Sequence, residues 1–154
     1  MSIEQADIPA TAQQSGSDLD DDLNFLLARA AAVSIAAANR ALRAYGLKAR
    51  SYSVLALAST DKPASQKDIA DFLRLDPSQV VALVDELESH ALVERVSDPR
   101  DRRAKVVVAT SEGRKVARAA TAATRRAETR LHSQFSPGER AELMAYLRML
   151  AFPT

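Results

Sequence analysis

The chain has 154 residues, of which 47% are hydrophobic and only 5% aromatic, and it contains no cysteine. This composition excludes a wholly disordered chain, disulfides and thiolate metal sites, and it favours packed helices in a reducing, cytoplasmic setting. No uninterrupted apolar run reaches about 18 residues, so we expect no membrane segment. The acidic start also lacks the basic and apolar regions of a secretory signal.

The net charge of +1 hides an uneven distribution along the chain. Residues 1–22 carry six acidic residues and no base, whereas residues 95–126 carry ten bases and three acids. A local excess of positive charge is typical of a surface that binds a phosphate backbone, although a solvated helix face gives the same signal. The ten bases are Arg95, Arg100, Arg102, Arg103, Lys105, Arg114, Lys115, Arg118, Arg125 and Arg126.

The first 46 residues predict a flexible arm followed by one long helix. Residues 1–16 show no hydrophobic periodicity, which indicates the arm. Ser17 is a candidate N-cap, apolar residues then recur every three or four positions, and Gly46 favours a helix end. So long a helix in so small a protein is typical of a dimerisation element, and we assign residues 17–46 to this role.

Residues 47–110 predict a compact lobe that begins with three short helices. The first helix is expected over 51–60, and Ser65 and Asp76 are the candidate N-caps of the next two. The apolar face predicted for the helix after Ser65 consists of Ile69, Phe72 and Leu73.

The hydrophobic period changes to strand-like beyond residue 91. The segments 92–96 and 104–108 read as strands on either side of a polar, cationic turn, which predicts a hairpin. Two further helices are expected, one from about 110 to 132 and one capped by Ser136. Because their apolar stripes exceed what a small lobe can bury, we assign residues 111–154 to dimerisation.

The order helix, turn, capped helix and basic hairpin over residues 65–108 is that of a winged helix-turn-helix. The chain is therefore expected to be α+β, mainly α. The N-terminus of the helix after Asp76 can enter a major groove about 12 Å wide. The hairpin can place arginine in the adjacent minor groove.

Several segments resemble the MarR (multiple antibiotic resistance regulator) family. The segment from Asp98 to Arg103, followed by a strand and Ala109-Thr110-Ser111-Glu112-Gly113, is similar to the wing and exit of that family. Residues 80–88 and 92–95 are similar to its recognition helix and first wing strand. The resemblance covers roughly residues 20–150, and it implies a dimer that binds palindromic DNA.

The resemblance also implies roles for individual residues. Ser65 and Gln66 match phosphate-contacting positions, and Arg102, with Arg100 as the alternative, matches the arginine of the minor groove. Asp101 and Arg103 resemble the pair that braces the wing. The positions that match groove-facing recognition residues are Ser78, Gln79, Val81 and Ala82. The alternatives are solvated turn charges, ordinary first-turn residues and, for Val81, a half-buried core position.

Two departures from the family pattern bear on DNA binding. Ala91 stands where the family usually has a glycine, so either this alanine is left-handed or the helix ends differently. Val81 and Ala82 stand where threonine and arginine are frequent; they can contact thymine methyls but cannot form hydrogen bonds to bases.

The junction around Gly46 is a candidate ligand site, because apolar and polar groups from two lobes meet there. Proteins that resemble this one often bind aromatic acids or phenols at such a junction. The alternative is that both tyrosines are core residues with satisfied hydroxyls. The candidate ligand-binding residues are Asn39, Arg43, Tyr45, Ser51, Tyr52 and Leu55.

No other motif indicates catalysis or a cofactor. His90 and His132 lack paired-ligand spacing, and the phosphate-binding glycine motifs are absent, so we expect no enzyme, no metal and no cofactor. The favoured function is a homodimeric, ligand-responsive repressor that binds double-stranded DNA. The alternatives are a ligand-independent architectural DNA-binding protein and a winged-helix protein-interaction module.

Overall fold

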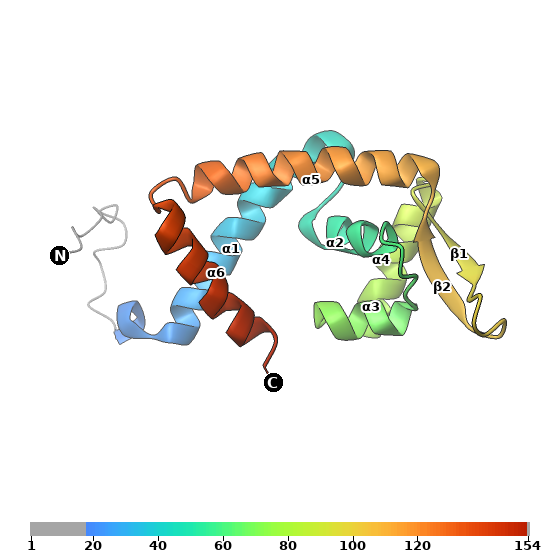
Figure 1. Ribbon diagram of the computed structural model, residues 1–154, viewed down its shortest axis with the longest axis horizontal. Helices are drawn as coiled ribbons and strands as arrows, with labels where there is room; N and C mark the ends of the chain where they lie inside the picture. Colours follow the sequence, from blue (N-terminus) through green and yellow to red (C-terminus); the bar gives the residue numbers. More distant parts are fainter. Residues whose placement is uncertain (1–17, 154) are drawn as a thin grey trace. The chain divides into compact units, whose positions relative to one another are not determined.

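The computed structural model describes residues 18–153, and it confirms the expected fold class: mainly helical, with one two-stranded antiparallel sheet. The chain forms two compact units, one up to Val33 and one from Ser34 onward, and α1 begins in the first and ends in the second. The elements shown in Figure 1 are a 3₁₀ turn (Asp18–Asp21), α1 (Leu23–Leu42), a 3₁₀ turn (Arg43–Tyr45), α2 (Ala49–Ala58), α3 (Gln66–Leu73), α4 (Pro77–Ser89), β1 (Val93–Ser97), β2 (Lys105–Ala109), α5 (Ser111–Leu131) and α6 (Pro137–Ala151).

The first long helix begins later than the sequence predicted. Asp22 stands at its start, because its carboxylate accepts a hydrogen bond from the Phe25 amide at 2.7 Å. The acidic residues before it form the separate 3₁₀ turn. The α-helix ends at Leu42 and a 3₁₀ turn follows it; Gly46 ends this turn, and its φ of 67° lies in the left-handed region that glycine tolerates. The predicted arm, residues 1–16, and the predicted cap Ser17 lie outside the described residues.

Helix α1 and the turn after it, Leu23–Tyr45, have the length and the mean hydropathy, 1.3, of a helix that could cross a membrane. The sequence predicts no such segment, because no uninterrupted apolar run is long enough. Length and composition are the only support for a membrane span, and they equally suit a helix that packs against protein. Arg29 also lies within this stretch and is exposed.

Polar caps set the starts of the helices in the lobe. The Ser65 hydroxyl accepts the Asp68 amide of α3 at 3.1 Å, which confirms Ser65 as the cap, and the Asp68 carboxylate accepts the Ser65 amide at 3.0 Å, which completes a capping box. The Ser65 hydroxyl and the Ser65 amide both donate to the Asp68 carboxylate, and these two bonds lower the pKa of Asp68. Helix α2 begins at Ala49, two residues earlier than predicted, because the Ser51 hydroxyl accepts the Lys48 amide at 2.9 Å.

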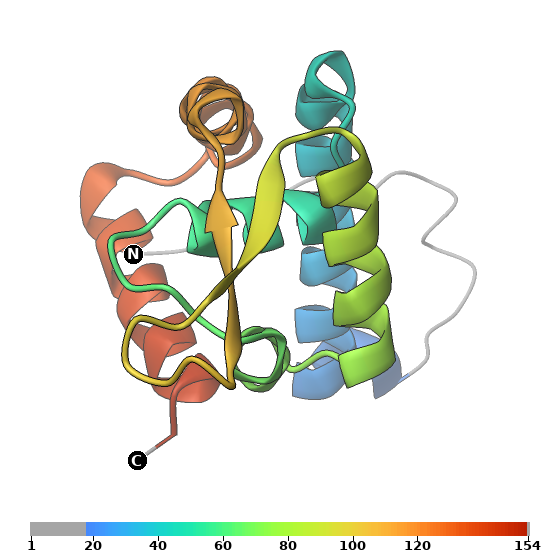
Figure 2. The same ribbon diagram turned by 90° about the vertical axis from the view of Figure 1, so that its right-hand side faces the viewer.

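The hairpin is displaced by one residue from its predicted position. Its strands β1 and β2 pair antiparallel, with Val93 opposite Ala109 and Ser97 opposite Lys105. The Val107 amide also donates to the Ala64 carbonyl at 2.9 Å, which ties the segment before α3 to β2. Figure 2 shows the hairpin beside α4, with the two strands leading down to the turn that forms the wing tip.

The core of the second unit lies between α2, α3, α4, the hairpin and α5. Its largest fully buried side chains are Leu42, Leu55, Ile69, Leu87, Val54, Val80, Val84, Val93, Val106 and Val107. One predicted core residue is misplaced: Phe72 is 57% exposed. Its apolar neighbours Ile69 and Leu73 face the core, whereas the ring of Phe72 contacts Phe152 with centroids 6.0 Å apart.

The start of α5 packs directly on the end of the α4–β1 connection. Thr110 caps α5, and its hydroxyl donates to the Ala91 carbonyl at 2.7 Å while its amide donates to the Leu92 carbonyl at 3.0 Å. A Cβ at Gly113 would lie 1.8 Å from the Leu92 carbonyl oxygen. Glycine at this position therefore permits the close approach that joins α5 to the hairpin.

Candidate nucleic-acid interface

The N-terminus of α4 presents the predicted recognition residues to solvent. The Asp76 carboxylate caps the helix by accepting the Ser78 amide at 2.8 Å, and Pro77 occupies the first helical position. Val80, Val84 and Leu87 on the opposite face are buried in the core. The four predicted groove-facing residues, Ser78, Gln79, Val81 and Ala82, are all exposed.

Val81 is 39% exposed, so it is not a core residue, and its methyl groups are available to a partner. Two of its polar neighbours are already engaged in the cap. The Ser78 hydroxyl donates to the Asp76 carboxylate at 2.5 Å, a bond that lowers the pKa of Asp76. The Gln79 side-chain oxygen accepts the Asp76 amide at 3.4 Å, a long contact that a base could replace.

The start of α3 brings Ser65 and Gln66 to a half-buried position. The Ser65 hydroxyl donates to the Asp68 carboxylate at 2.7 Å, so its proton is committed to the cap. The Gln66 side-chain oxygen accepts a hydrogen bond from Arg95 Nε at 2.7 Å. The amide nitrogen of Gln66 is the group that remains to donate to a phosphate.

The arginines at the wing tip differ in whether they form an ion pair. Arg100 is paired: its guanidinium contacts the Asp98 carboxylate at 3.1 and 3.2 Å, and its backbone amide donates to the same carboxylate at 2.8 Å. These bonds lower the pKa of Asp98, which is a buried residue. Arg102 and Arg103 are exposed and, within residues 18–153, form no ion pair.

This arrangement bears on the two roles that were expected at the wing. The ion pair within the turn joins Asp98 and Arg100, whereas the Asp101 carboxylate accepts the backbone amide of Arg103 at 3.0 Å. No side-chain bond between Asp101 and Arg103 is present in the described part of the chain. Of the two candidates for the minor groove, Arg102 is therefore free to reach DNA, and Arg100 first has to leave Asp98.

The sequence reading missed the structural part played by Arg95, which it counted only among the basic residues. Arg95 contacts Asp85 at 2.5 Å, pairs with Glu88, and donates to Gln66, so one side chain joins β1 to α4 and α3. The signal in the sequence was the three-residue spacing of Asp85 and Glu88, which places both carboxylates on one face of α4.

The backbone conformation of Ala91 shows how α4 ends with an alanine where the family usually has a glycine. Ala91 adopts the left-handed conformation with φ of 56°, and the next amide, of Leu92, donates back to the Leu87 carbonyl at 2.9 Å. The alanine thus keeps the geometry that a glycine would provide, at a steric cost.

The six candidate ligand residues near Gly46 serve mainly as structure. Leu55 is fully buried, Ser51 bonds to Lys48, and the Asn39 side chain accepts the Ala49 amide at 2.7 Å. Tyr52 packs on the core and its hydroxyl bonds with Thr121 at 3.0 Å. Tyr45 is also packed on the core, whereas Arg43 is exposed. The contacts of Tyr45 and Tyr52 therefore agree better with core residues than with ligand-binding residues.

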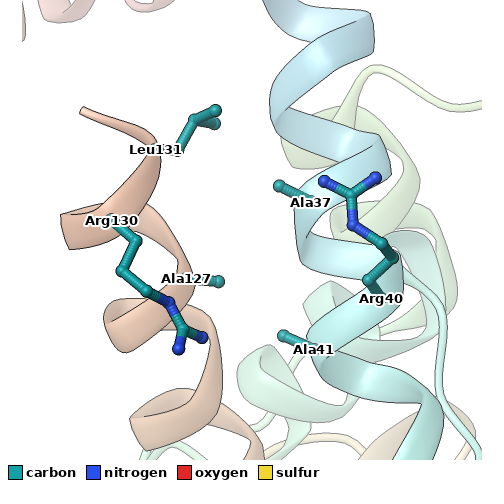
Figure 3. Close-up of a pocket in the computed structure, with 6 residues that line it drawn as sticks. All are labelled: Ala37, Arg40, Ala41, Ala127, Arg130 and Leu131. Atoms are coloured by element: carbon teal, nitrogen blue, oxygen red, sulfur yellow. The ribbon is translucent and has the colours of Figure 1, made fainter. Parts of the chain in front are cut away.

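Hollows are present between the second half of α1 and α5 and beside the α5–α6 turn. One hollow of about 420 Å³ has Ala37, Arg40 and Ala41 on its α1 wall and Ala127, Arg130 and Leu131 on its α5 wall (Figure 3). Two arginines on alanine-rich walls suit an organic anion with an apolar part. Among residues 18–153, no cluster of three histidine or acidic side chains could hold a metal ion.

Comparison with known proteins identifies the family. The model of the MarR family matches residues 47–105. CouR from Rhodococcus jostii RHA1, crystallised with p-coumaroyl-CoA, is 42% identical over 91% of this chain and 98% of its own, with a TM-score of 0.82. The chain belongs to the MarR family. The resemblance seen in the wing and the recognition helix is thus confirmed, and the chain is a MarR-family transcriptional regulator.

Other members of the MarR family share the fold over nearly the whole chain. A MarR-family regulator from Rhodococcus sp. RHA1 is 40% identical, over 91% of this chain and 100% of its own, with a TM-score of 0.82. A repressor CouR bound to a 23-mer DNA duplex is 27% identical over 89% and 97%, with a TM-score of 0.81. No curated protein sequence gives a significant match. MarR-family regulators are in general DNA-binding proteins rather than enzymes.

Proposed function

We propose that this regulator is a repressor that binds a palindromic DNA site as a homodimer and that a small aromatic effector releases it. The observation that carries the DNA-binding part is the pairing of an exposed, capped α4 N-terminus with exposed arginines at the wing tip. Support also comes from the 27% identical repressor CouR, which is bound to a 23-mer DNA duplex.

In this proposal α4, the start of α3 and the wing tip each make a different kind of contact with DNA. Gln79 reads bases through its amide, and Val81 and Ala82 contact thymine methyls in the major groove. Gln66 donates to a phosphate from its side-chain amide, and Ser65 does so once its hydroxyl leaves Asp68; such contacts fix orientation without reading sequence. Arg102 enters the minor groove, where the negative potential is strongest when the groove is narrow.

The homodimer is proposed because the terminal helices leave large apolar side chains exposed. The exposed residues are Leu23, Leu26 and Val33 in the first unit, and Ile35, Tyr146, Leu147, Met149 and Leu150 in the second. Large exposed apolar patches mark interaction sites. Residues 17–46 and 111–154 then form the dimer, and residues 47–110 form the DNA-reading lobe of each subunit. Two-fold symmetry of the protein calls for a palindromic site.

The proposed effector is an aromatic acid or its coenzyme A thioester. The 42% identical CouR is bound to p-coumaroyl-CoA, and the hollow lined by Arg40 and Arg130 offers cationic side chains beside apolar walls. The junction near Gly46, with Arg43 and Tyr52, is the other candidate location. A hundredfold loss of DNA affinity requires about 2.7 kcal/mol of coupling between the effector and DNA sites.

Selection of bound duplexes from a random pool, followed by titration at several salt concentrations, tests the DNA-binding part. We expect one palindromic sequence to be enriched and affinity to fall steeply with salt, because several phosphates are neutralised. Binding without sequence preference would instead identify an architectural protein, and an absence of binding would favour a protein-interaction module.

The same duplex tests the assignment of Gln79. Gln79→Ala should change the preference among base pairs at one position of each half-site, because a paired contact to adenine is lost. A uniform loss of affinity across all sequences would place Gln79 on the backbone instead.

The effector is tested by titrating p-coumaroyl-CoA, p-coumarate and coenzyme A against the protein–DNA complex. Release by the thioester or the acid supports the proposal, and no release by any of them contradicts it. Repeating the titration with Arg40→Ala and Arg130→Ala, and with Arg43→Ala and Tyr52→Phe, locates the site, because only the pair that lines it should weaken release.

A further inference from the structure

Arg95 lies at the meeting point of the three elements that form the DNA-reading surface. From β1, its Nε donates to Gln66 of α3 at 2.7 Å and a terminal nitrogen reaches the Asp85 carboxylate of α4 at 2.5 Å. The other terminal nitrogen pairs with Glu88, whose carboxylate also accepts the Arg95 backbone amide at 3.2 Å. Each of the three guanidinium nitrogens thus has a partner within the protein, and the side chain is 26% exposed.

The two carboxylates that Arg95 contacts lie on the helix that is expected to enter the major groove. Asp85 and Glu88 are 61% and 42% exposed, respectively, and without a partner their charges would repel a phosphate backbone. Burial disfavours the charged guanidinium, but the bonds and charges of Asp85 and Glu88 outweigh it and raise the pKa of Arg95. The charge on Arg95 is thus used to neutralise α4.

The contact with Arg95 also fixes which way the Gln66 amide faces. A guanidinium can only donate hydrogen bonds, so the oxygen of the Gln66 amide has to face it. The two N–H donors of that amide consequently point to the other side, where they can donate to an acceptor. Lysine at position 95 could supply the charge, but it lacks the planar fork that holds three partners at once.

We propose that Arg95 is a positioning residue of the DNA interface and not a phosphate ligand. It holds β1, α3 and α4 together, removes the repulsion between DNA and the carboxylates of α4, and turns the donors of Gln66 toward a phosphate. This inference rests on the proposed DNA-binding function.

The first experiment compares Arg95→Met with Arg118→Met, which removes the same charge from an exposed position on α5. Affinity for the selected duplex should fall at least tenfold in Arg95→Met, while the slope of log affinity against log salt stays at the wild-type value. Arg95→Lys should recover only part of the loss. A slope reduced by about one in Arg95→Met would mean direct phosphate contact and overturn the proposal. Unchanged affinity would overturn it as well.

The second experiment separates positioning from simple loss of stability. Asp85→Asn and Glu88→Gln, added together to Arg95→Met, should restore much of the DNA affinity, because they remove the uncovered charges. Gln66→Glu should raise the unfolding temperature, through a stronger bond to Arg95, and yet weaken DNA binding, because the donors are lost. Binding that follows the unfolding temperature in all these variants would reduce Arg95 to a structural residue. Wild-type protein that binds no duplex would refute the proposed function itself.

Discussion

Leu55 of α2 is completely buried, whereas Leu150 of α6 is 57% exposed, although both are leucines on helices of one chain. The parts of the chain around these two leucines differ in burial in the same way. The lobe formed by α2, α3, α4 and the hairpin has a continuous core of buried aliphatic side chains. Helix α6 has no buried residue, and its apolar stripe faces outward.

The comparison indicates what each region requires in order to be stable. The lobe obtains its stabilisation from contacts within one chain, since burial of apolar area is the dominant favourable contribution. The stripe of α6 gains nothing comparable until another surface covers it. Changes in the lobe should therefore alter the unfolding of each subunit, and changes in α6 should alter association.

The largest effect is expected from Leu150→Glu, which places one charge per subunit in the proposed dimer interface. An unpaired buried charge costs about 3–5 kcal/mol, and the dimer would contain two of them. Sedimentation at low micromolar concentration should show a dimer for the wild type and a 16.7 kDa species for the variant. Arg148→Glu, an exposed change on the same helix, serves as the control. A wild-type protein that sediments only as the monomer would contradict the comparison.

A smaller but still large effect is expected from Gly113→Ala, within the lobe. The added Cβ would lie 1.8 Å from the Leu92 carbonyl oxygen, which is backbone and cannot swing away. Overpacking typically costs about 1–3 kcal/mol and occasionally more, and we expect the upper end here because the clash is with backbone; urea unfolding would measure it.

The matched control for this change is Gly138→Ala, also in the first turn of a long helix, where an added Cβ meets nothing within 4 Å. That variant should be neutral or slightly more stable, because alanine favours helix. Equal stabilities for the two variants would show that α5 is not held against the hairpin in this way.

Arg102→Ala should weaken DNA binding by about 1–3 kcal/mol and lower the salt slope by about one, without changing stability. The reason is that Arg102 is exposed at the wing tip, so its guanidinium is available to DNA. Arg100→Ala is the informative comparison, because Arg100 is held by Asp98 and should lose less affinity. A larger loss for Arg100→Ala than for Arg102→Ala would reverse the assignment of the two arginines.

Features fixed by local chemistry were predictable from the sequence. The predicted caps at Ser65, Asp76 and Ser136 depend on residues two or three positions away, and all three are observed. The hairpin followed from the change of hydrophobic period, although it was placed one residue too early. Boundaries of this kind depend on which hydrogen bonds form, and periodicity does not determine them.

Features fixed by distant contacts were not predictable. Arg95 is separated from Gln66 by 29 positions, so nothing local indicated that it would be held in an ion-pair cluster. Phe72 fits the apolar period of α3, yet it lies outside the core, because the period alone does not say how wide the buried face is. Near Gly46, the polar groups expected to bind a ligand have partners within the protein: Asn39 accepts the Ala49 amide, and the Tyr52 hydroxyl bonds with Thr121.

The smallest effect is expected from Ala91→Gly, and it concerns the stability of the lobe alone. Ala91 has φ of 56°, a conformation in which the Cβ crowds the backbone at a cost of roughly 1–2 kcal/mol. Glycine removes this cost but adds conformational freedom to the unfolded chain, which offsets about 0.5–1 kcal/mol of the gain. The net result should be a stabilisation between about 0 and 1.5 kcal/mol, measured by urea unfolding. Because the backbone geometry is already that of a glycine, the angle of the wing should not change, and DNA affinity should equal that of the wild type.

Arg74→Gly, at the other left-handed position, at the end of α3, should shift stability in the same direction. A loss of stability in Ala91→Gly would show that the methyl group makes contacts that outweigh the strain, and a change in DNA affinity would show that the alanine sets the position of the wing.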